Sequence, residues 1–354
     1  ENLLVPRFRK PLLRSPCSLG SRAMGGAVGS STSLDMRQVR RRAEDRIGVL
    51  PVAGRYHRPP KLIQNQYSFD GHALGAGCNG HVVRARSRCS GMPVAVKTFN
   101  FQSMLEGQIA DMANEVEVHL GLDHPHVCRL LEVYETPAQL CLVMECCEGG
   151  ELFHRVKDRR HFDEPDAART ARQLLLALNY MHGRGVVHRD LKLENCVYDR
   201  KDSDFIKLID YGFSTFFTED TKMDECLGTL AYVAPEVLQR DYSGGSCDMW
   251  SLGVIVFILL AGYSPFGGQT DRLVMRRVMK GAFSMQGARW MAVSPAGRDF
   301  LQRLLCVHPT ERLTAEMALA HPWIAQHTET VEPLALDPSI PAAFANLPRA
   351  SCLE

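Results

Sequence analysis

The stretch VVHRDLKLEN, residues 186–195, holds three side chains of different chemistry within a few positions of one another: Asp190, Lys192 and Asn195. The stretch falls between a predicted helix and a predicted strand, so we expect it to form an irregular loop. Transfer of a phosphoryl group needs a base that accepts a hydroxyl proton, a cation beside the moving group and a metal ligand. The three residues supply these chemistries in that order, a combination that an ordinary solvated turn rarely assembles.

A glycine-rich stretch lies upstream, GAGCNGHV at residues 75–82, between two predicted strands. Its glycines at positions 75, 77 and 80 (Gly75, Gly77 and Gly80) allow backbone amides to approach a phosphate closely. On its own the stretch is better explained as an ordinary glycine-rich hairpin, because such hairpins are common. Because it precedes a strand rather than a helix, it argues against a dinucleotide-binding fold.

A lysine and a glutamate form the next candidate pair. Lys97 ends the apolar strand VAVK, residues 94–97, and Glu115 follows on a predicted helix. An ion pair between them would fix the ammonium group against the α- and β-phosphates of ATP. The alternative is that Lys97 is a strand-edge residue whose ammonium group reaches water.

Two further motifs follow the loop: Asp-Tyr-Gly at residues 210–212, within KLIDYGFS, and Ala-Pro-Glu at residues 234–236. The complete series is a glycine-rich strand pair, a strand lysine, a helix glutamate, H-R-D-L-K-x-x-N, D-x-G and A-P-E. In this order the motifs resemble the signature set of protein kinases. The resemblance covers Tyr67–Ile324.

The predicted elements and the resemblance agree on an α+β fold of two lobes, the bilobal protein-kinase fold. We expect a β-rich N-lobe with one regulatory helix at residues 67–145 and a helical C-lobe at residues 149–324. The activation segment is expected at residues 210–236. Residues 1–60 are expected to be a basic disordered tail, and residues 325–354 a C-terminal extension that faintly resembles the start of a regulatory junction.

The resemblance implies a role for each polar residue of the site. Asp190 would be the base, Lys192 would accompany the phosphoryl group, and Thr229 would contact both of them. Asn195 and Asp210 would hold Mg²⁺. The positions that match the ATP cleft, with Met144 as gatekeeper before the hinge, are Leu74, Gly75, Gly77, Gly80, Val82, Ala95, Lys97, Met144, Glu145, Cys147, Glu151 and Val197.

Three other residues match structural positions of the family. Asp248 resembles the residue that braces the catalytic loop, and Glu236 and Arg312 resemble an ion pair of the C-lobe. Within kinases, Lys192 after HRDL resembles the serine/threonine class. Runs such as LVMECCEGGELF and GTLAYVAPEVL are similar to the calmodulin-dependent group, most of all to the calcium-dependent kinases of plants and protists. The chain has no D-x-[DN]-x-[DN]-G loop, so calcium control is an expectation about residues beyond Glu354.

Two carboxylates are candidates for binding the substrate. Glu151 and Glu194 match positions at which basophilic kinases bind an arginine, and two carboxylates on one guanidinium group favour Arg by bidentate pairing. We therefore predict a preference for Arg three residues before the target Ser or Thr. The alternative is that each is an ordinary solvated glutamate.

Regulation is expected at Glu225, three residues before Gly228, where many kinases place an activating phosphothreonine. Its carboxylate could pair with Arg189 and order the activation segment without phosphorylation. Thr218 and Thr221 leave a switch by phosphorylation open as the alternative.

The charge distribution bears on partners and location. Residues 1–60 hold 12 Lys and Arg against four Asp and Glu, and the remaining 294 residues hold 29 against 36. We expect a cytoplasmic monomer that binds protein substrates and no nucleic acid, with weak membrane association through the basic tail. MGGAVGS at residues 24–30 resembles an N-myristoylation start if Met24 begins the protein, with Gly25 as the acylated residue. A flexible Gly/Ser tail is the alternative.

The rival function is a catalytically impaired scaffold, and one departure from the family lies in the metal motif itself. Tyr211 stands where the family usually has phenylalanine, and His119 stands where it usually has an aliphatic residue beside that ring. We expect a hydrogen bond between the two; the alternative is that His119 faces solvent and Tyr211 packs alone. Every polar catalytic position is filled, which favours an active enzyme.

Overall fold

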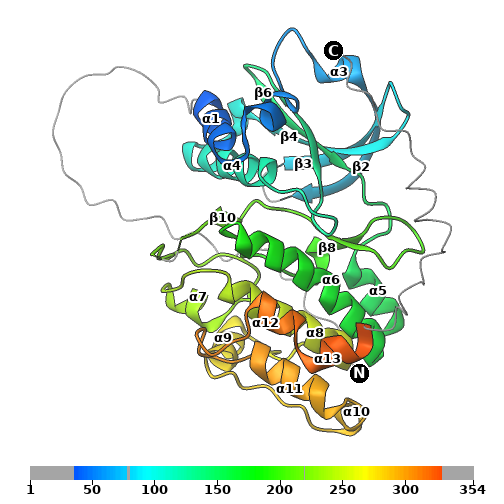
Figure 1. Ribbon diagram of the computed structural model, residues 1–354, viewed down its shortest axis with the longest axis vertical. Coiled ribbons are helices and arrows are strands. Elements are labelled where there is room, and N and C mark those ends of the chain that lie inside the picture. Colours follow the sequence, from blue (N-terminus) through cyan, green and yellow to red (C-terminus); the bar gives the residue numbers. More distant parts are fainter. Residues whose placement is uncertain (1–35, 78–79, 219, 329–354) are drawn as a thin grey trace, which may run out of the picture.

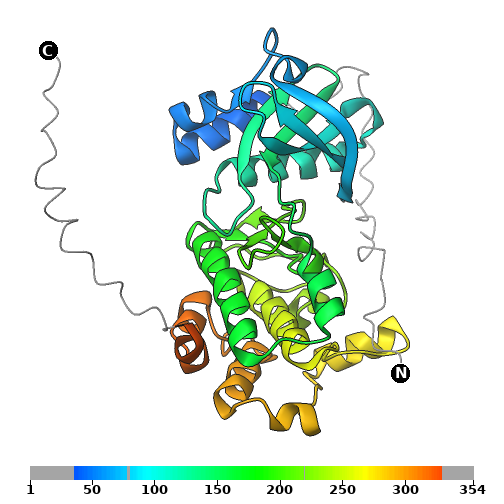
Figure 2. The same ribbon diagram turned by 90° about the vertical axis from the view of Figure 1, so that its right-hand side faces the viewer.

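The computed structural model describes residues 36–77, 80–218 and 220–328, which form two lobes (Figure 1). The smaller lobe is built on a six-stranded sheet, and the larger lobe is mainly helical. Turned by a quarter, the molecule shows the sheet of the smaller lobe standing above the helices of the larger one (Figure 2). The predicted bilobal α+β fold is confirmed.

The sheet of the smaller lobe brings the nucleotide-facing positions together. The strands are β1 (Tyr56–His57), β2 (Tyr67–Gly77), β3 (Gly80–Ser87), β4 (Pro93–Asn100), β5 (Leu130–Glu135) and β6 (Gln139–Glu145), in the spatial order β1-β5-β6-β4-β3-β2. Lys97 on β4 lies opposite Val82 on β3, and Ala95 lies opposite Met144 on β6. Residues this close in an antiparallel sheet present their side chains on the same face. Helix α4 (Glu106–Leu120) packs against this lobe and carries Glu115.

The N-terminal part of the described chain is folded, so the prediction of a disordered tail is wrong for residues 36–60. Helix α1 (Met36–Ile47) and helix α2 (Val49–Ala53) precede β1, which pairs in parallel with β5. Met36, Val39 and Ala43 recur at helical spacing and are buried against α4. The many arginines around this narrow apolar face led to the prediction of disorder. Residues 1–35, with Gly25, lie outside the described residues.

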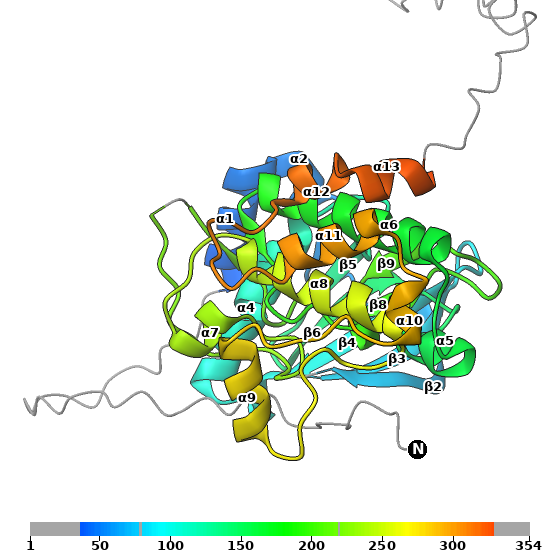
Figure 3. The same cartoon turned by 90° about the horizontal axis from the view of Figure 1, so that it is seen from below.

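The larger lobe surrounds one buried helix, α8 (Ser246–Ala261), whose residues from Cys247 to Leu260 are all buried. Seen from below, α8 runs through the middle of this lobe (Figure 3). Among the described residues, no helix is both long and apolar enough to cross a bilayer. The other helices of the lobe are α5 (Leu152–Arg159), α6 (Glu164–Gly183), α7 (Pro235–Gln239), α9 (Asp271–Met279), α10 (Ala288–Met291), α11 (Pro295–Leu304), α12 (Ala315–Leu319) and α13 (Pro322–Thr328).

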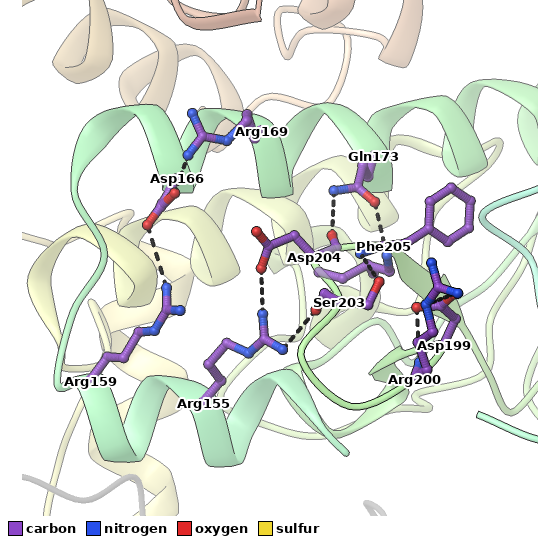
Figure 4. A network of polar contacts seen from close by, with 11 residues as sticks. Arg155, Arg159, Asp166, Arg169, Gln173, Asp199, Arg200, Ser203, Asp204 and Phe205 are labelled. Carbon is purple, nitrogen blue, oxygen red and sulfur yellow. Dashed lines mark hydrogen bonds and ion pairs between the residues drawn. The ribbon is translucent and has the colours of Figure 1, made fainter. Parts of the chain in front are cut away.

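A short hairpin beneath the cleft carries residues of the site. Strands β8 (Cys196–Tyr198) and β9 (Ile206–Leu208) pair antiparallel and are fastened to α5 and α6 by polar contacts (Figure 4). Arg155 donates to Asp204 at 2.7 Å, while Gln173 donates to the Asp204 carbonyl and accepts from the Ile206 amide, each at 2.8 Å. Because Asn195 directly precedes β8 and Asp210 closely follows β9, this anchoring fixes the spacing of the two expected metal ligands.

Candidate active site

A cavity of about 680 Å³ lies between the lobes. Ten of the twelve positions expected to bind ATP line it: Leu74, Gly75, Val82, Ala95, Lys97, Met144, Glu145, Cys147, Glu151 and Val197. The other two, Gly77 and Gly80, pair with each other through the backbone at the tip of β2 and β3.

Sequence reasoning missed other residues of the lining. Arg84, two residues after Val82, shares its face of β3, so strand periodicity could have found it. Its guanidinium lies 2.8 Å from Glu148, just after the hinge, and so links the roof of the cavity to the hinge. The other lining residues that the sequence analysis did not name are His72, Cys128, Glu148, Gly150, His154 and Ile209, and those that it did name are Glu115, His119, Lys192, Glu194, Asn195, Asp210 and Tyr211.

The predicted ion pair between Lys97 and Glu115 is formed, with Nζ and Oε1 2.5 Å apart and both side chains buried. Burial raises the pKa of Glu115, and the lysine charge lowers it only in part. Lys97 also lies 3.5 Å from Oδ1 of Asp210. The lysine is therefore held in the cleft by one carboxylate from each lobe.

The catalytic loop is held from below by Asp248 on α8, as expected. Its carboxylate accepts hydrogen bonds from the backbone amides of His188 and Arg189 and contacts the His182 imidazole, each at 2.9 Å. Burial alone would raise the pKa of Asp248, but these partners hold it below its ordinary value. A charged brace thus fixes the backbone immediately before Asp190.

Asp190 lies at the centre of a polar cluster that the sequence predicted. The Thr229 hydroxyl donates to Oδ1 of Asp190 at 3.0 Å, and Lys192 contacts Oδ2. Lys192 also lies 3.4 Å from the Thr229 hydroxyl. The Asn195 amide donates to the Asp190 carbonyl at 2.8 Å. One oxygen of the base is thus oriented by a hydroxyl, while the other lies beside a cation.

Asp210 has the properties of a cation ligand. Its backbone is left-handed, with φ of 64°, a conformation that Asp and Asn tolerate better than most residues. Burial alone would raise the pKa of Asp210, but Lys97 and Lys192 outweigh it and hold that pKa below its ordinary value. Its buried Oδ1 accepts no hydrogen bond from the described residues. An ionised oxygen with spare capacity, in a cavity that Asn195 also lines, fits Mg²⁺.

Comparison with known proteins gives the family. The family model for the protein kinase domain matches residues 69–324, which hold the cleft and both lobes. The chain belongs to the protein kinase family. A Caenorhabditis briggsae protein named calcium/calmodulin-dependent protein kinase type 1 is 39% identical over 273 residues, covering 76% of this chain and 76% of that protein.

Two relatives of the calcium-dependent type are similar at the same level. Calcium-dependent protein kinase 3 of Plasmodium yoelii yoelii is 36% identical over 263 residues, covering 74% of this chain and 48% of that protein. Calcium-dependent protein kinase 12 of Arabidopsis thaliana is 36% identical over 268 residues, covering 75% and 54%. This kinase is a serine/threonine protein kinase of the group that contains these relatives.

The expected hydrogen bond between Tyr211 and His119 does not form in this kinase. The Tyr211 hydroxyl donates to the Leu208 carbonyl at 2.7 Å, and Nε2 of His119 lies 2.7 Å from the Cys128 carbonyl. Each polar group finds a nearby backbone acceptor instead, while the two rings pack with centroids 4.7 Å apart. Burial lowers the pKa of His119 to about 4, so the imidazole is neutral near pH 7.

Two ion pairs of the larger lobe match the sequence predictions. Glu225 lies 2.9 Å from Arg189 of the catalytic loop, as expected for an acidic group that replaces a phosphate. Arg189 is further held by the Phe213 carbonyl at 2.6 Å. Glu236 and Arg312 form a buried bidentate pair with distances of 2.6 and 3.0 Å. The first pair belongs to the activation segment and the second to the scaffold beneath it.

Proposed function

We propose that this kinase transfers the γ-phosphoryl group of ATP, with Mg²⁺, to Ser or Thr hydroxyls that lie three residues after an arginine. The observation that carries the substrate preference is Glu194, whose Oε2 is buried and has no hydrogen-bond partner among the described residues. A buried carboxylate oxygen without a hydrogen-bond partner is costly unless a ligand pairs with it. The residue lines the cavity together with Glu151.

The residues of the cleft supply what phosphoryl transfer needs. Asp190 accepts the proton of the substrate hydroxyl, and Lys192 stabilises the charge that moves with the phosphoryl group. Lys97, aligned by Glu115, orients the nucleotide phosphates. Bound Mg²⁺, for which Asn195 and Asp210 are the fitting ligands, would neutralise phosphate charge.

The arginine preference follows from charge and burial. Burial raises the pKa of Glu194 above its ordinary value, and the charges of Glu151 and Asp190 act in the same direction. An arriving guanidinium group relieves this repulsion and donates to two carboxylates at once. Among the described residues, the Glu151 carboxylate has only a long contact of 3.7 Å with the exposed His154. Both carboxylates therefore have capacity for an external cation.

Replacing Glu194 by glutamine should lower kcat/KM for a peptide with Arg three residues before the serine by about 10- to 100-fold, because a hydrogen bond to a charged partner is lost. The same variant should phosphorylate an Ala-containing peptide as well as the parent enzyme does. The matched control is Asp158→Asn, an exposed carboxylate on α5. Equal kcat/KM values for the Arg and Ala peptides in the parent enzyme would contradict the proposal.

The same preference should depend on pH. Because the pKa of Glu194 is raised, this carboxylate takes up a proton at a higher pH than an exposed glutamate, whose pKa is about 4.3. The ratio of kcat/KM for Arg over Ala peptides should therefore be highest near neutral pH and fall as the solution is acidified. In Glu194→Gln the ratio should be low and nearly independent of pH.

We also propose that Glu225 activates the kinase without phosphorylation of the activation segment. Glu225→Ala should lower kcat by only about 3- to 10-fold, because the Glu225 carboxylate is half exposed and Arg189 keeps its bond to the Phe213 carbonyl. The measurement uses bacterially expressed, phosphatase-treated protein. The parent should be fully active after this treatment. Activity that is present before the phosphatase treatment and absent after it would show that Thr218 or Thr221 must be phosphorylated.

We also propose where the kinase is located and how it is assembled. We place the kinase in the cytoplasm as a monomer that binds protein substrates and no nucleic acid, with membrane association if Gly25 is myristoylated. Two arginines of the basic N-terminal segment are already paired: Arg40 with Glu44 and Arg42 with Glu117, so their charges are partly used within the fold. Intact-mass analysis after co-expression with the acyl transferase tests the modification.

A further inference from the structure

Helix α1 covers the outer face of α4, the helix that carries Glu115 (Figure 1). Met36, Val39 and Ala43 of α1 are buried in one cluster with side chains of α4 and of the sheet. The members of that cluster on α4 are Met112, Ala113, Val116 and Leu120. The segment therefore forms part of the core of the smaller lobe, although it lies before the residues that the family model matches.

The contact is completed by a buried charge. Glu117 on α4 is only 5% exposed, and both of its carboxylate oxygens are bonded by α1. Nε of Arg42 lies 2.6 Å from Oε2, and Nε of Arg46 lies 3.1 Å from Oε1. A buried carboxylate that loses such partners becomes strongly destabilising, so Glu117 ties the position of α4 to that of α1.

The end of α4 is held by the same N-terminal segment. Arg55, just before β1, donates to the carbonyl of Leu120, the last residue of α4, at 2.8 Å and to the Leu130 carbonyl at 3.3 Å. A cation at the C-terminus of a helix satisfies carbonyls that have no partner within the helix and interacts favourably with its dipole. The N-terminal segment thus holds the C-terminal part of α4 through the side chain of Glu117 and through the carbonyl of Leu120.

The N-terminal segment also contacts the activation segment. The guanidinium of Arg46 lies 3.7 Å from the centre of the Phe216 ring, on β10 (Thr215–Phe216). Strand β10 pairs with β7 (Val186–Val187), which leads directly into the catalytic loop. Asn114 of α4 also donates to the Ser214 carbonyl at 2.5 Å. Arg46 therefore contacts α4 and the activation segment at the same time.

Glu115 and Glu117 are two residues apart, which places them about 200° apart around a helix of 3.6 residues per turn. The side chain of Glu115 meets Lys97 in the cleft, while that of Glu117 meets α1 on the outside. A rotation or outward shift of α4 that breaks one pair must therefore disturb the other. The contacts of α1 with Glu117 form only when α4 is in this position. They therefore favour the position of α4 in which Glu115 also reaches Lys97.

We propose that α1 is a positioning element for phosphoryl transfer, which holds α4 through Arg42 and Arg46 in the place where Glu115 reaches Lys97. The three residues Arg42, Arg46 and Glu117 are positioning residues, since none of them lines the cavity. When the contacts of Arg42 and Arg46 with Glu117 are lost, α4 also adopts positions in which Glu115 does not align Lys97. The fraction of enzyme molecules able to transfer the phosphoryl group therefore falls.

The test is a charge reversal with its compensation. Glu117→Arg places three cations together. It should lower kcat by about tenfold and raise KM for ATP, because about tenfold fewer molecules would have α4 in the active position. The triple variant Arg42→Glu/Arg46→Glu/Glu117→Arg restores opposite charges and should recover most of the loss. The control is Arg41→Glu, which makes the same charge change as each arginine substitution of the triple variant, but on the exposed side of α1, and it should match the parent.

A role in folding alone predicts a different result. In that case Glu117→Arg would lower the unfolding temperature but leave kcat unchanged when measured well below that temperature. Unchanged kcat in a folded Glu117→Arg protein, or no recovery in a folded triple variant, would overturn the proposal. If Glu117→Arg gives no folded protein, Glu117→Gln keeps the side-chain shape and should lower kcat about threefold, with parent-like kcat again overturning it.

Discussion

Asp190→Asn is expected to lower kcat by about 10²- to 10⁴-fold, because the asparagine cannot accept the proton of the substrate hydroxyl. The structure predicts little change in nucleotide binding, since Asp190 does not line the cavity that holds the ATP-binding positions. Asn keeps the size of the side chain and can still accept from Thr229, which lies 3.0 Å from Oδ1. The loss should therefore appear in kcat, with KM for ATP nearly unchanged.

The measurement is γ-phosphate transfer to an Arg-containing peptide with Mg²⁺, together with ATP binding by the same protein. An amide nitrogen facing Lys192 and the Asn195 amide removes two favourable contacts, so a modest decrease in unfolding temperature is also expected. Parent-like kcat in Asp190→Asn would remove Asp190 from the role of base. An inactive parent enzyme that still binds ATP would instead favour the impaired scaffold.

The contacts that the sequence predicted correctly share one property: their partners are set by the family's motif order. Lys97 meets Glu115, Asp248 meets the backbone of the catalytic loop, and Glu225 meets Arg189. Each pair joins charged groups that are costly to bury alone, so only a narrow set of arrangements satisfies them. Charge and position in the motif therefore predict the contact, although not its distance.

The sequence predictions that were wrong concern contacts that no motif specifies. Residues 36–47 show only a narrow apolar face among many arginines, and the helix gains its stability from α4, which lies far along the chain. Isolated short helices are marginal in water, so local sequence gives a weak signal for such an element. Tyr211 and His119 are adjacent as expected, but their hydrogen bonds go to backbone carbonyls, whose directions depend on details of the local fold.

Asp210→Asn is expected to abolish measurable Mg²⁺-dependent transfer, with a decrease in kcat/KM of at least about 10³-fold. The substitution removes a full negative charge from a position where Lys97 and Lys192 keep the carboxylate ionised. It also suits the backbone, because Asn tolerates the left-handed conformation that Asp210 adopts, with φ of 64°. Loss of function should therefore come from the lost charge rather than from misfolding.

A binding measurement separates the metal site from catalysis. ATP with Mg²⁺ should raise the unfolding temperature of the parent more than ATP with EDTA does, because a ligand that binds the folded state stabilises it. In Asp210→Asn this Mg²⁺-dependent difference should disappear. The matched control is Asp202→Asn, an exposed aspartate that is also left-handed, with φ of 62°, in the turn between β8 and β9. The control should keep the full Mg²⁺ effect, since it makes the same chemical change on the same kind of backbone away from the cleft. An unchanged Mg²⁺ effect in Asp210→Asn would mean that the cation is held by other residues, and that the tyrosine-containing motif has lost its metal.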